Sequence, residues 1–202
     1  MQLPPATRWL SLALTLTTTT VISPLVAQSC FTGRPVPQCR SFWITEAGFS
    51  VRLDDHPNKD GGSVTFDLGY AVNIGGQSAL GVSGFLRGGE PVGGGGIRGR
   101  YRLWLGGATS LDLAPGILLA SSGGQFDYKA GTFSGQVALN VTRGFGLVAQ
   151  VDQVRLASNT FTFPNGETTD VAWYAGGRLS GGAGLGGILA FLALGALVAA
   201  TW

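Results

Sequence analysis

The chain has 202 residues, 12% of them charged and 45% hydrophobic, with a formal net charge of +2 and 34 glycines. A disordered chain is excluded because disorder needs low hydrophobicity and a high net charge, and a highly charged soluble enzyme is disfavoured. The length corresponds to one domain, and the lack of an overall basic excess disfavours a nucleic-acid-binding protein.

Residues 1–27 have the features of a secretory signal peptide. Arg8 is the only charge, a short apolar and threonine-rich stretch follows it, and Ala27 is a small residue before a cleavage point. A membrane-spanning anchor is the alternative, but the stretch is short for that role. A lipid anchor on Cys30 is disfavoured because the residues before it fit the required motif poorly. We therefore expect export and removal of residues 1–27.

The N-terminal segment 28–42 contains both cysteines of the chain, Cys30 and Cys39. An even number of closely spaced cysteines in an oxidising compartment predicts a disulfide that closes a small loop. A metal site is disfavoured, because there is no third cysteine and the sole histidine, His56, is distant in the sequence. We expect neither a metal nor a cofactor.

From residue 43 onward the dominant pattern is a strict period of two. Between Ser63 and Ile74, apolar residues such as Val64 and Phe66 alternate with residues such as Thr65 and small or acidic ones. This alternation predicts a β-strand with one apolar and one polar face. The pattern recurs, and the predicted strands are residues 43–53, 63–74, 78–87, 97–105, 110–120, 132–142, 145–156 and 168–179.

The connections between these strands alternate in length. Long connections at 54–62, 88–96, 121–131 and 157–167 alternate with short ones at 75–77, 106–109 and 143–144. An even number of antiparallel strands with short turns at one end and long loops at the other is typical of bacterial outer-membrane barrels.

By this pattern, the chain resembles the small eight-stranded outer-membrane β-barrel proteins, the class that includes outer membrane protein A and adhesion-type barrels. The resemblance covers residues 43–179 and contains no single diagnostic motif. It implies an all-β fold, an eight-stranded antiparallel up-and-down transmembrane β-barrel located in the bacterial outer membrane. It transfers no functional residue to this chain.

A soluble exported barrel that binds a ligand would show the same alternation with its faces inverted. A water-facing surface uses lysine and glutamate freely, but the whole chain has two lysines and three glutamates. The polar face is instead rich in small residues, which suit a narrow barrel interior. These are Gly48, Gly69, Ala71, Gly81, Ala114, Gly116, Ala138, Gly146, Ala172 and Gly176.

If the polar face points inward, its charges should nearly cancel, because an unpaired buried charge is costly. Arg87 lies at a predicted strand end and is set aside; the remaining inward set has five acids and five arginines. A solvated charged face is the alternative interpretation. The predicted interior network is Glu46, Arg52, Asp67, Arg98, Arg100, Arg102, Asp112, Asp152, Asp170 and Arg178. With Gln136, Asn140 and Gln150, these side chains would fill the interior and leave no wide channel.

The last segment, residues 180–202, departs from the strand pattern. Residues 185–202 carry no charge and are apolar on both parities, which favours a C-terminal apolar helix. A final strand ending at Trp202 is the alternative. Such a helix departs from the family pattern. It also argues against the outer-membrane location, because a long apolar helix tends to be held in the inner membrane.

The predicted function is that of an integral outer-membrane barrel with a closed, charge-filled interior and a structural or surface-interaction role through its long loops. Outer-membrane lipid and an unknown extracellular ligand at the loops are the expected partners, nucleic acid is not, and the expected state is a monomer. The alternatives are a lipid-modifying enzyme and a narrow pore. Catalysis needs a nucleophile, a base and an orienting acid at one rim, and His56 has no evident partner, so we expect no enzyme and no catalytic residue.

Overall fold

The computed structural model describes residues 29–53, 61–89, 93–122, 131–156 and 168–201. The predicted signal peptide and His56 lie outside these residues. The described elements are β1 (Ser29–Cys30), β2 (Ser41–Arg52), β3 (Gly62–Ile74), β4 (Ser78–Gly89), β5 (Gly93–Gly106), β6 (Thr109–Ser122), β7 (Thr132–Asn140), β8 (Phe145–Leu156), β9 (Thr168–Ser180) and α2 (Gly182–Thr201).

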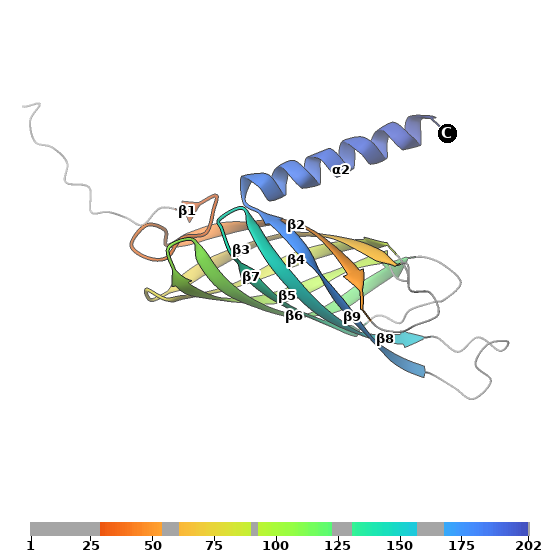
Figure 1. The fold of residues 1–202 in the computed structure, drawn as a ribbon, viewed down its shortest axis with the longest axis horizontal. Helices are drawn as coiled ribbons and strands as arrows, with labels where there is room; N and C mark the ends of the chain where they lie inside the picture. The colour runs from red at the N-terminus through yellow and green to blue at the C-terminus, as the bar shows by residue number, and fades with distance from the viewer. Residues whose placement is uncertain (1–28, 54–60, 90–92, 123–130, 157–167, 202) are drawn as a thin grey trace, which may run out of the picture.

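Strands β2 to β9 form a closed, eight-stranded antiparallel β-barrel in which each strand pairs with the next (Figure 1). The barrel closes where β2 pairs with β9, from Glu46↔Ser180 to Arg52↔Tyr174. The prediction of an eight-stranded antiparallel barrel is therefore confirmed. We call the end with the connections 75–77, 107–108 and 141–144 the turn side, and the opposite end the loop side.

The register fixes the width of the barrel. A path of paired residues that leaves β2 at Ser41 and passes through every strand returns to β2 at Val51, ten residues along. Eight strands with this stagger tilt by about 40° and enclose a backbone cylinder of radius about 8 Å, given their usual spacing. Side chains alone can fill an interior of this size.

The long connection predicted at residues 88–96 is wrong. Strand β4 continues to Gly89 and β5 already begins at Gly93, so these two strands are joined by residues 90–92. A glycine run shows no alternation of side chains, but its backbone pairs normally. At Gly96 a Cβ would lie 2.1 Å from the carbonyl oxygen of Ile117, so the close approach of β6 requires glycine there.

The N-terminal segment folds onto the turn side. Cys30 and Cys39 form the predicted disulfide, with their Cα atoms 5.8 Å apart. Strand β1 pairs in parallel with the first two residues of β2, a stretch of β2 that β9 does not reach. Two residues are too few to show a periodic pattern, so β1 was not predicted.

Helix α2 lies outside the barrel, begins at the turn side and slants away from the wall (Figure 1). The prediction of a C-terminal helix is therefore confirmed. Its first half packs on β2 and β9, where a Cβ at Gly184 would lie 2.2 Å from the carbonyl oxygen of Thr45. The ring of Phe191 contacts that of Phe66, with centroids 4.8 Å apart. Within the described part of the chain, no helix is both long and apolar enough to cross a membrane.

Candidate functional site

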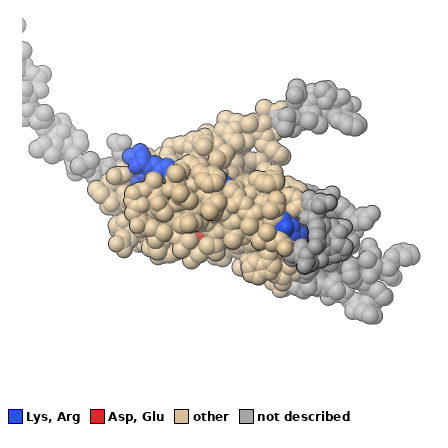
Figure 2. All heavy atoms as spheres, viewed as in Figure 1, with Lys and Arg blue, Asp and Glu red and all other residues tan. Residues whose placement is uncertain are grey.

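The distribution of side chains is the reverse of that in a water-soluble protein. Leu68, Val82 and Leu86 on the outer wall are 59%, 57% and 65% exposed. Each acidic side chain that the structure describes is 3% exposed: Glu46, Asp67, Asp112 and Asp152. The face in Figure 2 is accordingly almost entirely uncharged, with blue at its two ends and a trace of red. The polar side chains face the barrel interior.

On the turn side, three arginines converge on one carboxylate. Glu46 from β2 lies 2.9 Å from Arg100, 3.2 Å from Arg102 and 2.8 Å from Arg178. Asp112 from β6 accepts hydrogen bonds from Nε and Nη2 of Arg102, both at 2.6 Å, and also pairs with Arg178. Because the planar guanidinium can bridge two carboxylates, these contacts join four strands across the interior.

In the middle of the barrel, Asp67 is the centre of a second set of contacts. It pairs with Arg98 at 3.1 Å and with Arg100 at 2.6 Å, and it accepts a hydrogen bond from Ser83. The guanidinium of Arg98 stacks 4.0 Å from the ring centroid of Phe85 and donates to Gln150 on β8 at 3.5 Å. Arg98 therefore links β5 to the opposite wall.

Towards the loop side, Arg87 pairs with Asp152. Gln150 donates to both oxygens of Asp152 at 2.9 and 3.0 Å, and Arg87 lies 4.3 Å from the ring centroid of Tyr174. Arg87 had been set aside because the predicted strand ended there. Since β4 continues to Gly89, Arg87 points inward and is 8% exposed. It lies four residues after the buried Ser83, and residues four apart in a strand share a face, so the sequence could have indicated its inward position.

The structure brings eight of the ten predicted network residues together: Glu46, Asp67, Arg98, Arg100, Arg102, Asp112, Asp152 and Arg178. Arg52 is half-buried at the end of β2, and the side chain of Asp170 lies outside the described ones. With Arg87 added to the eight, the described network residues that these ion pairs join are four carboxylates and five guanidinium groups.

An apolar cluster that was not predicted from the sequence lies at the turn-side end of the interior. Phe42, Ile44, Ala71 and Ala79 pack together, with Trp104 against them. The rings of Phe42 and Trp104 meet edge to face at 5.8 Å. Phe42 precedes the predicted first strand, so its inward position was not assigned.

The arrangement cross-links strands on opposite sides of the barrel. Each described carboxylate is paired with arginine, so none is poised as a free base. Among the described residues there is no group of three side chains suited to hold a metal ion.

No protein-family model and no curated protein matches the chain. A solved structure described as a de novo designed transmembrane β-barrel is similar over 74% of this chain and 98% of its own length, with 8% identity and a TM-score of 0.38. A similarity this low carries no argument about fold or function, and the description of the barrel depends on the strand pairing alone.

Proposed function

We propose that the chain is an integral β-barrel of the bacterial outer membrane with a closed polar interior. The observation that supports this best is the reversed distribution of side chains, with the charges inside and large apolar side chains on the outer wall. A soluble barrel would place those apolar side chains inside, because their burial is the main force that folds proteins in water. Lipid is the solvent that such an outer wall requires.

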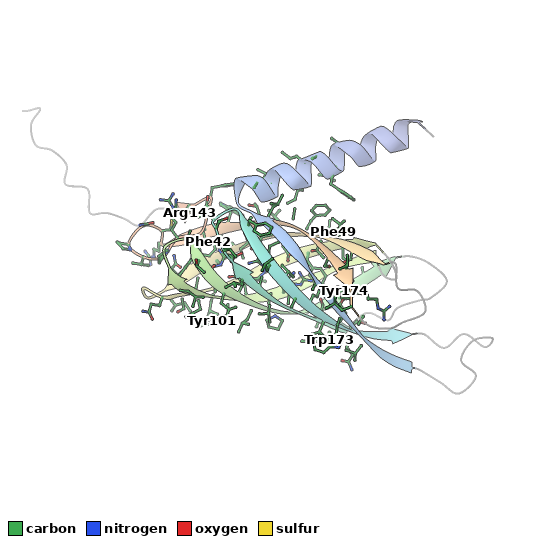
Figure 3. All side chains as sticks on the ribbon, in the orientation of Figure 1. Phe42, Phe49, Tyr101, Arg143, Trp173 and Tyr174 are labelled. Atoms are coloured by element: carbon green, nitrogen blue, oxygen red, sulfur yellow. A yellow bond between two sulfur atoms is a disulfide. The ribbon has the colours of Figure 1, made fainter. Side chains whose placement is uncertain are left out.

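The dimensions of the barrel support the same proposal. Strands of 12 residues, such as β2 and β4, rise by about 30 Å at a tilt of about 40°, against an apolar band of about 25 Å in outer-membrane barrels. Aromatic side chains occur near both ends: Trp43 packs on Tyr70 at 5.3 Å, and Trp173 lies towards the other end (Figure 3). Such side chains favour the two membrane interfaces.

For the role of the barrel, we propose a structural or surface-interaction function without catalysis. The interior network and the apolar cluster fill much of a narrow interior, which supports a closed barrel over a wide pore. Specificity would then reside in the connections on the loop side, because loops on a rigid barrel are free to vary. We further propose that the barrel is a monomer whose partners are outer-membrane lipid and a ligand at those loops.

Cell fractionation and heat-modifiable migration on a gel test location and closure together. We expect the protein in the outer-membrane fraction, without residues 1–27 by intact mass, and migrating differently before and after boiling. A protein that is soluble without detergent would contradict the proposal. In planar bilayers we expect no large, steady conductance; such a conductance would favour a pore, and hydrolysis or transfer of lipid acyl chains would favour an enzyme.

A further inference from the structure

A small cavity opens at the turn-side end of the barrel. Its volume is about 30 Å³, and it is lined by residues of the disulfide loop, of β5, of the β7–β8 turn and of the end of β9. The disulfide loop is held over this end because Asn73 donates to the carbonyl oxygens of Arg34 and Cys39 at 2.6 and 2.8 Å. We call this space the mouth cavity.

Positive charge dominates the mouth cavity. Arg34, Arg102 and Arg143 line it, together with a single acidic residue, Glu46. That carboxylate is already shared by the three arginines of the turn-side network, and among the described residues that line the cavity there is no other acidic side chain to pair with Arg34 and Arg143. Figure 3 places Arg143 near this end of the barrel.

Arg102 presents an unused part of its guanidinium to the cavity. Its Nε and Nη2 bond to Asp112 and Glu46. Its Nη1 lies 2.7 Å from the Cβ position that a side chain at Gly33 would occupy, under the disulfide loop. The side chain is 13% exposed, against 5% or less for Arg87, Arg100 and the other members of the network.

Among the described members of the interior network, Arg102 is the one nearest to solvent. A buried cation in a medium of low dielectric constant is stabilised by an anion in contact with it. An anion at the mouth is therefore well placed to accept a hydrogen bond from the Nη1 of Arg102.

The start of α2 adds further hydrogen-bond donors. Ser180 and Gly181 line the cavity, and α2 begins at the next residue, Gly182. The first N–H groups of a helix have no partner within the helix and favour an anion. The hydroxyl of Ser180 is buried and makes no hydrogen bond within the described structure.

We propose that the mouth cavity is a binding site for a phosphate group. A volume of about 30 Å³ is that of one water molecule, so it admits one or two phosphate oxygens and leaves any ester substituent outside. The phosphate can belong to a lipid headgroup or to a free anion. The site itself belongs to the folded barrel, and only the lipid source rests on the proposed membrane location.

The test is a titration of the purified barrel in dodecyl maltoside at constant ionic strength. Inorganic phosphate and dioctanoyl phosphatidic acid are the two probes; chloride and dioctanoylglycerol are their controls. Because Trp43 and Trp104 line the cavity, binding should change tryptophan fluorescence in a saturable way. Binding of phosphate alone supports a free anion as the source, and binding of phosphatidic acid alone supports a lipid headgroup. Binding of both supports a site that accepts a phosphate group from either source.

The variant R34Q/R143Q should weaken binding by tenfold or more, since each arginine supplies charge-assisted hydrogen bonds. R40Q is the matched control, because Arg40 is also exposed but does not line the cavity. Heat-modifiable migration verifies that each variant still forms a barrel. The proposal is overturned if neither probe saturates, if the two controls bind equally well, or if R40Q weakens binding as much as R34Q/R143Q. Since the titration is done in detergent, its result is separate from the test of membrane location.

Discussion

The pair formed by Arg87 and Asp152 offers a quantitative test of the interior network. Asp152 is 3% exposed, and besides Arg87 it accepts two hydrogen bonds from Gln150 and is attracted electrostatically by Arg98. Replacing Arg87 by Met therefore leaves a buried carboxylate without the guanidinium group that pairs with it directly. We expect the free energy of unfolding to fall by about 3–5 kcal/mol, the range for removal of one partner of a buried pair.

The double variant R87M/D152L should recover most of this loss. A buried ion pair replaced by apolar side chains of similar size is often neutral in stability, so the double variant should lie within about 1 kcal/mol of the parent. Both single variants and the double variant form a double-mutant cycle, and its coupling energy should be at least about 3 kcal/mol. R40Q, an exposed arginine replaced at the turn side, should change stability by less than about 0.5 kcal/mol.

Guanidinium unfolding of the refolded barrel in detergent micelles, followed by tryptophan fluorescence and by heat-modifiable migration, measures these free energies. If the free energy of unfolding of R87M lies within about 1 kcal/mol of that of the parent, the pair of Arg87 and Asp152 does not stabilise the barrel and the prediction is wrong. If the losses in the two single variants simply add in the double variant, the two side chains act independently.

Three further predictions concern the outer wall, the N-terminal segment and the helix. Leu68→Arg should destabilise the inserted barrel by about 2–4 kcal/mol near the bilayer midplane, measured by unfolding from vesicles, and a silent change would favour the soluble barrel. The mature protein should show no free thiol until it is unfolded and reduced, because Cys30 and Cys39 are bridged; two reactive thiols after denaturation alone would contradict this. Deletion of residues 181–202 should leave the strands complete, since β9 ends at Ser180, and loss of heat-modifiable migration would show that the tail is needed for assembly.

The strands could be predicted because a period of two is a local property of the sequence. Where the side chains were absent, as in the glycines at 93–96, the same reasoning placed a loop in what is a strand. Arg87 was left out of the predicted network for a related reason, because the strand was predicted to end at residue 87 and β4 ends at Gly89. Inward-facing residues can therefore be predicted from the alternation only where the ends of the strand are predicted correctly.

The partners of each charge could not be predicted from the sequence. Arg178 contacts Asp112, 66 residues earlier, and Glu46, 132 residues earlier. These neighbours follow from the stagger of the barrel, which no single strand specifies. The mouth cavity is formed by segments that are far apart in the sequence, from the disulfide loop to the end of β9, and no local pattern in any one of them indicates it.

The pairing of β2 with β9 has a consequence for how the molecule is made. These are the first and last strands of the barrel, so their edges stay open until β9 has been synthesised. An open barrel in lipid would expose unpaired backbone groups along both edges and present Arg178 without Glu46. Intermediates with fewer strands therefore gain little from entering the bilayer, and the contacts that reward entry connect residues far apart in the chain. Assembly is expected to be concerted, with insertion and closure of the wall occurring as one cooperative event.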